Sequence, residues 1–547
     1  MKHFTHPNDA AEQRIGVENQ LTDHLRGASH SARSSPDLST NKLSSFQYRT
    51  NMIPFAHFAL TCFSTLTFTF GCLNAEKSSS APSVADSSST VALFESINAE
   101  QTDDGSLTRL RRLDAASRST DGKLAILTAD EHLRRASVYA ANRLFREARE
   151  HWQIVVDRYA TNPNVPAALF GIGRAFYQER RFAEALPVFE RAGRDYSQTE
   201  AGRDGFYYVA PTLLRMNRAS EAAARYRLYI ERFPQGERIE NAHLNLIDTL
   251  REAEQPAEAT AWVARTRTRF AGTATDTNAL FGRLRLEVAE KNWSAAVRTA
   301  DELRAASFRR GVSTTPSEVS YLRAYSLEQS RQTAQAINAY AAIPDNLSSY
   351  YGGLATARLL ALGGAGRNQA QARQNRVRAE AFAAATNFPA PYRDIIVRLT
   401  ANTKVDPRLL LAVMRQESDF RTNAKSPAAA RGLMQMTTDT GAKYARQAGF
   451  NNLQEADYYR PEVSIGLATV YVAELIELFP NLAEAVAASY NGGEDNIARW
   501  LARAKSTDGG VFTSEVGFSE TKDYVAKVMA NYRAYSQLYT RDLRPQR

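Results

Sequence analysis

The stretch Val405–Met436, VDPRLLLAVMRQESDFRTNAKSPAAARGLMQM, contains the clearest helical signal in the chain. Asp406 and Pro407 predict a helix start, because Asp caps free backbone N–H groups and Pro fits the first helical position. The residues that then share one face of the helix are Leu410, Val413, Met414 and Glu417. Glu417 is the only carboxylate on this apolar face, so we expect burial to raise its pKa. A carboxyl group that stays protonated at neutral pH is what a general acid requires.

Two other interpretations of these carboxylates remain open at this point. Glu417 can sit at the edge of the apolar stripe with its head group in water. Asp419 is a candidate second catalytic carboxylate, but residues two positions apart on a helix point about 200° away from each other. The two groups can flank one bond only if the helix ends between them, and a carboxylate pair of a retaining glycosidase must lie about 5 Å apart.

Length and composition narrow the classes of chemistry. A chain of 547 residues with 44% apolar and 23% charged residues is expected to fold into two or three globular domains. The net charge of +9 suits an anionic partner without selecting one. Neither His nor Cys occurs from Leu244 to Arg547. This excludes Ser-His and Cys-His nucleophiles and His/Cys metal sites from the C-terminal half.

The N-terminal part has the pattern of an exported protein. Residues 1–51 predict a disordered extension, and residues 52–72 are an apolar segment that ends at Cys72. This segment predicts a secretory signal of lipoprotein type, and three outcomes stay open: lipid attachment at Cys72, cleavage without a lipid, or a retained anchor. Each takes the rest of the chain out of the cytoplasm. A Ser-rich linker and lead-in is expected over 73–130.

Residues 131–345 contain an internal repeat with a step of 37 residues. A four-residue motif ends at Ala148, Ala185, Ala222, Ala259 and Ala296, with a looser copy at Ala336. An aromatic residue keeps the same step at Tyr159, Tyr196, Phe233 and Phe270. Constant spacing of two markers predicts stacked helix–turn–helix units, which resemble tetratricopeptide repeats despite a typical period of about 34 for those. Residues 346–400 are expected to form a helical linker.

Three further blocks follow Glu417: GLMQ at 432–435, SYNGG at 489–493 and ETKDY at 520–524. In these blocks the chain resembles the soluble lytic transglycosylases of bacterial cell walls, glycoside hydrolase family 23. The resemblance implies an all-α protein, with a superhelix of helical repeats followed by a lysozyme-like catalytic domain at 401–540. It also implies non-hydrolytic cleavage of peptidoglycan between N-acetylmuramic acid and N-acetylglucosamine, with 1,6-anhydro products, Glu417 as acid and then base, and neither cofactor nor metal.

The same resemblance implies a set of substrate-binding residues: Ser426, Gln435, Ser489, Tyr490, Asn491 and Glu520. Gln435 offers a donor and an acceptor to an N-acetyl group or to Glu417. We expect Tyr490 to hold the sugar through its hydroxyl and Asn491 to fix the Asn-Gly turn. Tyr524 is expected to pack in the core. Ala429 stands where the family usually has Gly.

Peptidoglycan glycan strands are the partner that the resemblance implies, and nucleic acid is not expected because no basic run with interleaved aromatics occurs. The repeats are a candidate surface for cell-envelope proteins, and a lipid on Cys72 is a candidate membrane anchor. The expected location is the periplasm, with an outer-membrane lipoprotein as one form. The alternatives are a lysozyme-type hydrolase on the same fold and a non-catalytic repeat scaffold.

Overall fold

The computed structural model describes residues 103–546. The chain divides into two units, 1–51 and 52–547, and all described residues belong to the second. The predictions for 1–51, for the segment 52–72 with Cys72 and for residues 73–102 therefore lie outside the described residues. Within the expected lead-in, residues 104–117 form a helix, α4 (Asp104–Ser117), whose N-cap is Asp103.

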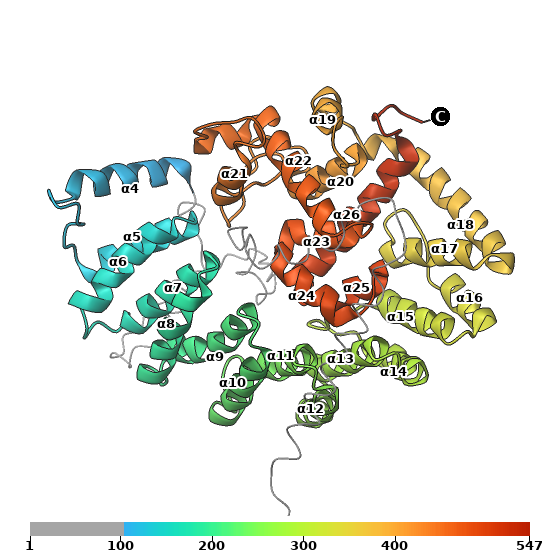
Figure 1. Cartoon of the computed structure of the whole chain (residues 1–547), viewed down its shortest axis with the longest axis horizontal. Coiled ribbons are helices and arrows are strands. Elements are labelled where there is room, and N and C mark those ends of the chain that lie inside the picture. The colour runs from blue at the N-terminus through green and yellow to red at the C-terminus, as the bar shows by residue number, and fades with distance from the viewer. Residues whose placement is uncertain (1–102, 547) are drawn as a thin grey trace, which may run out of the picture. The chain divides into compact units, whose positions relative to one another are not determined.

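The predicted repeats are confirmed as six consecutive helix pairs, which follow one another in order in Figure 1. The first helices of the pairs are α5 (Ala129–Ala141), α7 (Val165–Gln178), α9 (Glu200–Arg215), α11 (Ile239–Glu252), α13 (Ala274–Ala289) and α15 (Pro316–Gln329). The second helices are α6 (Phe145–Arg158), α8 (Phe182–Asp195), α10 (Ala219–Arg232), α12 (Pro256–Arg269), α14 (Trp293–Ala305) and α16 (Thr333–Ala341). All six marker alanines are 0% exposed, so each is fully buried among the packed helices. The four aromatic markers directly follow the last residues of α6, α8, α10 and α12.

The turn inside each pair repeats a strained backbone position. One residue per turn adopts a positive φ of 56–63°, and none is glycine: Arg143, Arg180, Asn217, Glu254, Lys291 and Arg331. In the first turn the N–H of Leu144 donates to the carbonyl of Tyr139, a bond of Schellman type that closes the end of α5. The positive φ of these turns could not be predicted from the sequence, because the glycine that usually marks such a position is absent.

The rest of the described chain is also helical, as the all-α prediction requires. The linker helices are α17 (Tyr350–Leu362) and α18 (Gly364–Ala383), followed by the short η2 (Ala385–Asn387). The C-terminal region contains α19 (Arg393–Thr400), α20 (Pro407–Ser418), α21 (Thr438–Tyr444), η3 (Glu455–Tyr459), α22 (Pro461–Leu478), α23 (Ala483–Gly492), α24 (Glu494–Ala504), α25 (Gly509–Glu515) and α26 (Ser519–Leu538). Helix α26 packs on both α20 and α23 and forms the centre of this region (Figure 1). β-Structure within residues 103–546 is limited to isolated bridges. No helix in this range is long and apolar enough to cross a membrane.

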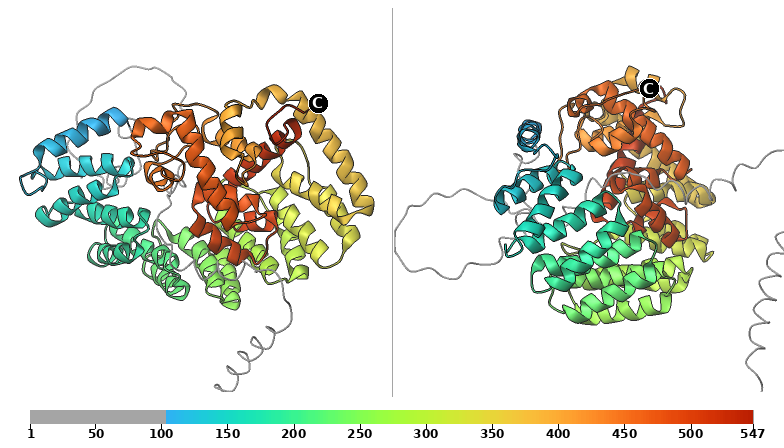
Figure 2. Two further views of the ribbon diagram at one scale, coloured as in Figure 1. Left: turned by 45° about the horizontal axis from the view of Figure 1, so that its top comes forward. Right: turned by 60° about the vertical axis from the view of Figure 1, so that its left-hand side comes forward.

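The turns inside the first five repeat pairs face the C-terminal region, which lies beside the repeats in both views of Figure 2. Five consecutive pairs contribute an ion pair from this edge: Arg143–Asp439 at 2.8 Å, Arg180–Glu494 at 3.1 Å, Arg215–Asp495 at 3.1 Å, Glu252–Arg503 at 2.9 Å and Glu290–Lys505 at 2.8 Å. Between them Glu515 is buried against three guanidinium groups, those of Arg251, Arg285 and Arg503. The repeats thus form a continuous support for the domain that carries Glu417.

Candidate active site

Glu417 lies in the last turn of α20, the helix that the sequence predicts from Asp406 onward. The helix begins as expected, with the Asp406 carboxylate accepting a 2.9 Å hydrogen bond from the N–H of Arg408. Its apolar face is fully packed, and Val413 and Met414 are at most 2% exposed. Asp419 ends the helix in the left-handed region, at φ 48°, and is exposed. Asp419 therefore lies at the end of α20, exposed to solvent.

Burial dominates the electrostatics of Glu417. Loss of hydration raises the pKa of its carboxyl from the ordinary 4.5 to about 8, even though a hydrogen bond from Tyr524 acts in the opposite direction. The Tyr524 hydroxyl donates to Glu417 Oε1 at 2.7 Å. The negative charge of Glu520 raises the same pKa further. Glu417 is consequently protonated at neutral pH and able to donate a proton.

Tyr524 has a role that the sequence analysis did not assign. Its ring packs in the core as predicted, at 5% exposure, but its hydroxyl also reaches the candidate acid. Burial and the nearby Glu417 hold the pKa of the Tyr524 hydroxyl well above 10, so the group stays a donor. A signal for this role exists in the sequence: Tyr524 lies four residues after Glu520, on the same face of α26.

The start of α26 is held in place by the repeats. Lys522 Nζ donates to Glu318 Oε1 on α15 at 3.1 Å and to the carbonyl of Ser313 at 3.2 Å. Burial raises the pKa of Glu520, which precedes Lys522 by two residues. The charge of Glu520 acts on Glu417, so the structure places a second carboxylate in the surroundings of the acid.

Residues 424–436 form a closed loop beside the end of α20, which we call the 424–436 loop. The N–H of Gly432 donates to the carbonyl of Ala424 at 2.8 Å, and Ser418 Oγ donates to the carbonyl of Leu433 at 2.8 Å. Gly432 has φ 73°, and a Cβ there would lie 2.1 Å from the carbonyl oxygen of Tyr458. The glycine is therefore required by the close approach of protein backbone, and not only by an approaching ligand.

The 424–436 loop contains two of the predicted substrate-binding residues. Gln435 Nε2 donates to the carbonyls of Ala424 and Gly432, at 3.1 and 2.9 Å, so its amide braces the loop. Ser426 Oγ accepts from the N–H of Ala430 at 3.2 Å. Ala429 has φ 59°, which explains why glycine suits that position.

The SYNGG block lies at the end of α23 and contacts the 424–436 loop. The Tyr490 hydroxyl donates to the carbonyl of Met434 at 2.7 Å, so its oxygen has lone pairs left for another donor. Asn491 Oδ1 accepts from Thr521 Oγ1 at 2.6 Å and thereby joins α23 to α26. The Ser489 side chain is 0% exposed and its Oγ has no hydrogen-bond partner among the described residues. This burial gives Ser489 no access to a ligand from the surface.

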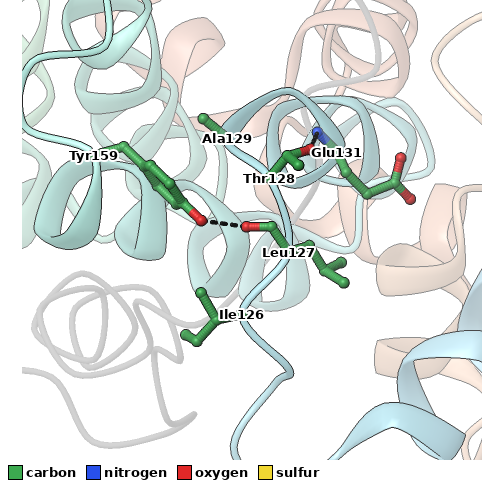
Figure 3. A pocket seen from close by; sticks show the side chains of 6 residues that line it. All are labelled: Ile126, Leu127, Thr128, Ala129, Glu131 and Tyr159. Carbon is green, nitrogen blue, oxygen red and sulfur yellow. Dashed lines mark hydrogen bonds between the residues drawn. The ribbon is translucent and has the colours of Figure 1, made fainter.

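A separate pocket lies at the start of α5, away from these residues. Figure 3 shows it where the Tyr159 hydroxyl donates to the carbonyl of Leu127. Its lining consists of Ile126, Leu127, Thr128, Ala129, Glu131 and Tyr159. None of the predicted site residues belongs to this pocket. Across residues 103–546, His, Cys, Asp and Glu form no group of three that is able to hold a metal ion.

Comparison with known proteins gives the family of both regions. Residues 394–512 match the transglycosylase SLT domain, and residues 133–198 match a tetratricopeptide repeat. The soluble lytic murein transglycosylase of Salmonella typhimurium is 31% identical over 150 residues, which are 27% of this chain and 23% of that protein. The membrane-bound lytic murein transglycosylase C of Edwardsiella ictaluri is 31% identical over 117 residues, 20% of this chain and 33% of that protein.

The region matched spans about a quarter of the Salmonella protein's length. Among solved structures, the 70 kDa soluble lytic transglycosylase of Escherichia coli aligns with 82% of this chain and 87% of its own, with a TM-score of 0.42 and 17% identity. The all-helical build, the helix pairs and the two domain matches agree with one another. The chain is therefore similar to soluble lytic transglycosylases, with a region that matches an SLT domain after a region that matches tetratricopeptide repeats.

Proposed function

We propose that the protein is a peptidoglycan lytic transglycosylase that cleaves the bond between N-acetylmuramic acid and N-acetylglucosamine without water. The observation that carries this proposal is the Glu417 carboxyl, which is half-buried, has a pKa raised to about 8 and is held by the Tyr524 hydroxyl. Such a group is a proton donor at neutral pH. The match of residues 394–512 to the SLT domain supports the same substrate class.

The proposed reaction uses Glu417 twice. Its carboxyl proton moves to the bridging oxygen as the bond from that oxygen to the anomeric carbon breaks. The carboxylate then takes the proton of the same muramic residue's 6-hydroxyl, whose oxygen attacks the anomeric carbon and closes the 1,6-anhydro ring. No water is consumed, and Glu417 ends as it began. The Tyr524 hydroxyl stabilises the carboxylate between the two steps, because a hydrogen bond to the charged form favours that form.

Substrate contacts are assigned to residues around Glu417. We propose that Ser426, Gln435 and Tyr490 contact the sugar and that Glu520 orders the surroundings of Glu417. Asn491 serves the fold through its bond to Thr521. Ser489 is left out of this set because its side chain is 0% exposed.

One observation favours a second candidate, a lysozyme-type hydrolase on the same fold. The charge of Glu520 acts on Glu417, and a second carboxylate is what a hydrolase needs to activate a water molecule or to attack the sugar. The two candidates differ in whether water enters the product.

Release of soluble fragments from purified peptidoglycan tests the substrate class. We expect release from intact peptidoglycan and no cleavage of chitin oligosaccharides, which lack the muramic residue. Cleavage of chitin oligosaccharides alone would contradict the proposed substrate.

The proposed substrate also places the protein in the periplasm, in line with the export pattern of residues 52–72. Cys72 is the candidate site for a lipid. Metabolic labelling with a radioactive fatty acid, with Cys72→Ala beside wild type, tests this part: label on wild type alone supports the anchor, and its absence from both removes it.

The raised pKa of Glu417 predicts a limit to activity at alkaline pH. Because the acid must be protonated, we expect kcat/KM to fall as pH rises above about 8, by about tenfold for each further pH unit. Initial rates of fragment release between pH 5 and 10, with protein integrity checked by circular dichroism at each pH, measure this limb. A fall that begins near the ordinary glutamate value of 4.5 would contradict a buried acid.

Removing the Tyr524 hydroxyl should move that limb. The hydrogen bond from Tyr524 lowers the pKa of Glu417, so in Tyr524→Phe we expect the alkaline limb to lie about one pH unit higher. Tyr532→Phe is the matched control, since its hydroxyl also lies on α26 but donates to Asp406 at 3.1 Å. An alkaline limb that stays in place in Tyr524→Phe, or moves equally in both variants, would show that the bond does not act on the acid.

A further inference from the structure

Asp104, in the first turn of α4, makes a contact that spans more than three hundred positions of the sequence. Its carboxylate accepts three hydrogen bonds, all from the C-terminal region: from Lys425 Nζ at 2.7 Å, Arg431 Nη2 at 2.7 Å and the Tyr459 hydroxyl at 2.9 Å. Asp104 Oδ1 takes both cations, and Oδ2 takes the tyrosine. The two carboxylate oxygens of Asp104 are therefore placed to accept from all three of these donors.

The centre of that donor set is Arg431, which lies inside the 424–436 loop. Its side chain is 1% exposed, and its guanidinium also donates to the carbonyl of Ala429 at 2.8 Å. Its backbone N–H and carbonyl both pair with Met436, at 3.0 and 3.1 Å. Within the 424–436 loop, Ser426 precedes Arg431 and Gln435 follows it, so Arg431 connects the two parts of the loop that contain them. A shift of Arg431 therefore displaces both candidate substrate contacts.

The contact depends on charge. A buried guanidinium is stable only when a counter-charge or a full set of acceptors replaces water. Burial acts to raise the pKa of Asp104, but the bonds from Arg431 and Lys425 outweigh it and hold the pKa near 2. The carboxylate is thus ionised throughout the working range of pH.

Other residues of α4 and of the turn after α5 also contact the loop or the residues that follow it. Asn142, which follows α5, accepts from Lys425 at 3.4 Å, and Arg143 pairs with Asp439 just after the loop. On α4 itself, Arg111 pairs with Glu455 at 2.7 Å, in an exposed position. Asp104 is the member of this group that reaches the buried Arg431.

We propose that Asp104 is a positioning residue of the active site: through Arg431 it holds the 424–436 loop in the shape that presents Ser426 and Gln435 to the glycan strand. This inference rests on the proposed function of the loop, and Asp104 itself does not touch the substrate. It gives α4 an indirect part in substrate binding, through the 424–436 loop.

The test compares Asp104→Asn with Asp103→Asn in the full chain. Asn keeps the shape of the side chain but removes the charge. Asp103 caps α4 by accepting from the N–H of Ser106 at 2.6 Å, whereas the hydrogen bonds from Lys425 and Arg431 of the loop go to Asp104. We expect Asp104→Asn to raise KM for solubilised glycan strands about tenfold, with kcat changed less than twofold, because a bond to a charged partner is lost. Asp103→Asn should leave both constants unchanged. Asp104→Glu, which restores the charge, should recover part of the KM.

Hydrogen–deuterium exchange provides a readout that needs no activity. We expect faster exchange of residues 424–436 in Asp104→Asn than in wild type or Asp103→Asn, with α22 and α26 unchanged. If wild type cleaves no peptidoglycan, the proposed function fails while this exchange result still tests the contact. Loop exchange and KM equal to those of wild type in Asp104→Asn would overturn the inference. Faster exchange across the whole C-terminal region would overturn it too, since that indicates a structural role alone.

Discussion

Glu417→Gln should lower the rate of fragment release from peptidoglycan by about a thousandfold or more, because it removes both the acid that protonates the bridging oxygen and the base that takes the proton of the 6-hydroxyl. Glutamine keeps the size of the side chain and an oxygen that accepts from Tyr524, so the packing at the end of α20 is preserved. The measurement is the initial rate of soluble muropeptide release by purified wild-type and variant protein under identical conditions.

Asp419→Asn is the control for this experiment. Asp419 is the nearest carboxylate in sequence, is exposed and has φ 48°, a conformation that asparagine adopts readily. We expect it to keep more than half of the wild-type rate. Equal losses in the two variants would assign the chemistry to a carboxylate pair instead of a single acid.

Glu417→Gln should also be more stable than the wild-type protein. The pKa of Glu417 is raised in the folded protein, so its contribution to stability is complete below pH 4.5 and is lost as pH rises toward 8. Because the side chain is half-buried, solvent screens part of this cost, and at pH 7.5 we expect Glu417→Gln to gain about 1–2 kcal/mol in the free energy of unfolding. A gain of this sign separates loss of chemistry from loss of fold.

Glu515→Ala should have the largest effect on stability. Glu515 is 1% exposed and accepts from Arg285 Nη1 at 2.9 Å, from Arg503 Nε at 2.8 Å and from Arg251. Burial alone would raise the pKa of Glu515, but these three cations hold it far below the ordinary value. Removal of the carboxylate leaves buried guanidinium groups short of counter-charge, and we expect a loss of about 3–5 kcal/mol in the free energy of unfolding.

Glu290→Ala is the matched control for Glu515→Ala, since Glu290 also pairs across the contact between repeats and C-terminal region. Its partner is Lys505 at 2.8 Å, and both side chains are at least 40% exposed. An exposed pair of this kind is worth less than about 1 kcal/mol. Urea unfolding followed by circular dichroism, taken at its first cooperative transition, measures both variants. Similar midpoints for the two would show that burial does not set the strength of these pairs.

The sequence predicted the parts of the fold that depend on local periodicity. The all-α class, the 37-residue repeat and the start of α20 at Asp406 are confirmed, because apolar spacing and capping residues act over a few positions. The alanine markers are all 0% exposed. The positive φ of the turns was not predicted, because Arg143 and the equivalent residues of the other turns are not glycine.

Contacts between distant segments were beyond reach from sequence alone. The placement of Tyr524 on Glu417 depends on how α26 crosses α20, and the Asp104–Arg431 contact depends on where α4 meets the 424–436 loop. Glu520 shows the same limit: its effect on the pKa of Glu417 arises from packing and not from spacing. Motif order located the candidate site, while its electrostatics required the fold.

Mass spectrometry of the fragments released in water enriched with the heavy oxygen isotope tests the central claim most directly. If Glu417 transfers its proton and the sugar's own hydroxyl closes the ring, each new end is lighter by one water than a hydrolytic end and contains no heavy oxygen. Fragments that carry the added water, with heavy oxygen at the new end, would contradict the account and would assign the activity to a hydrolase that uses a second carboxylate.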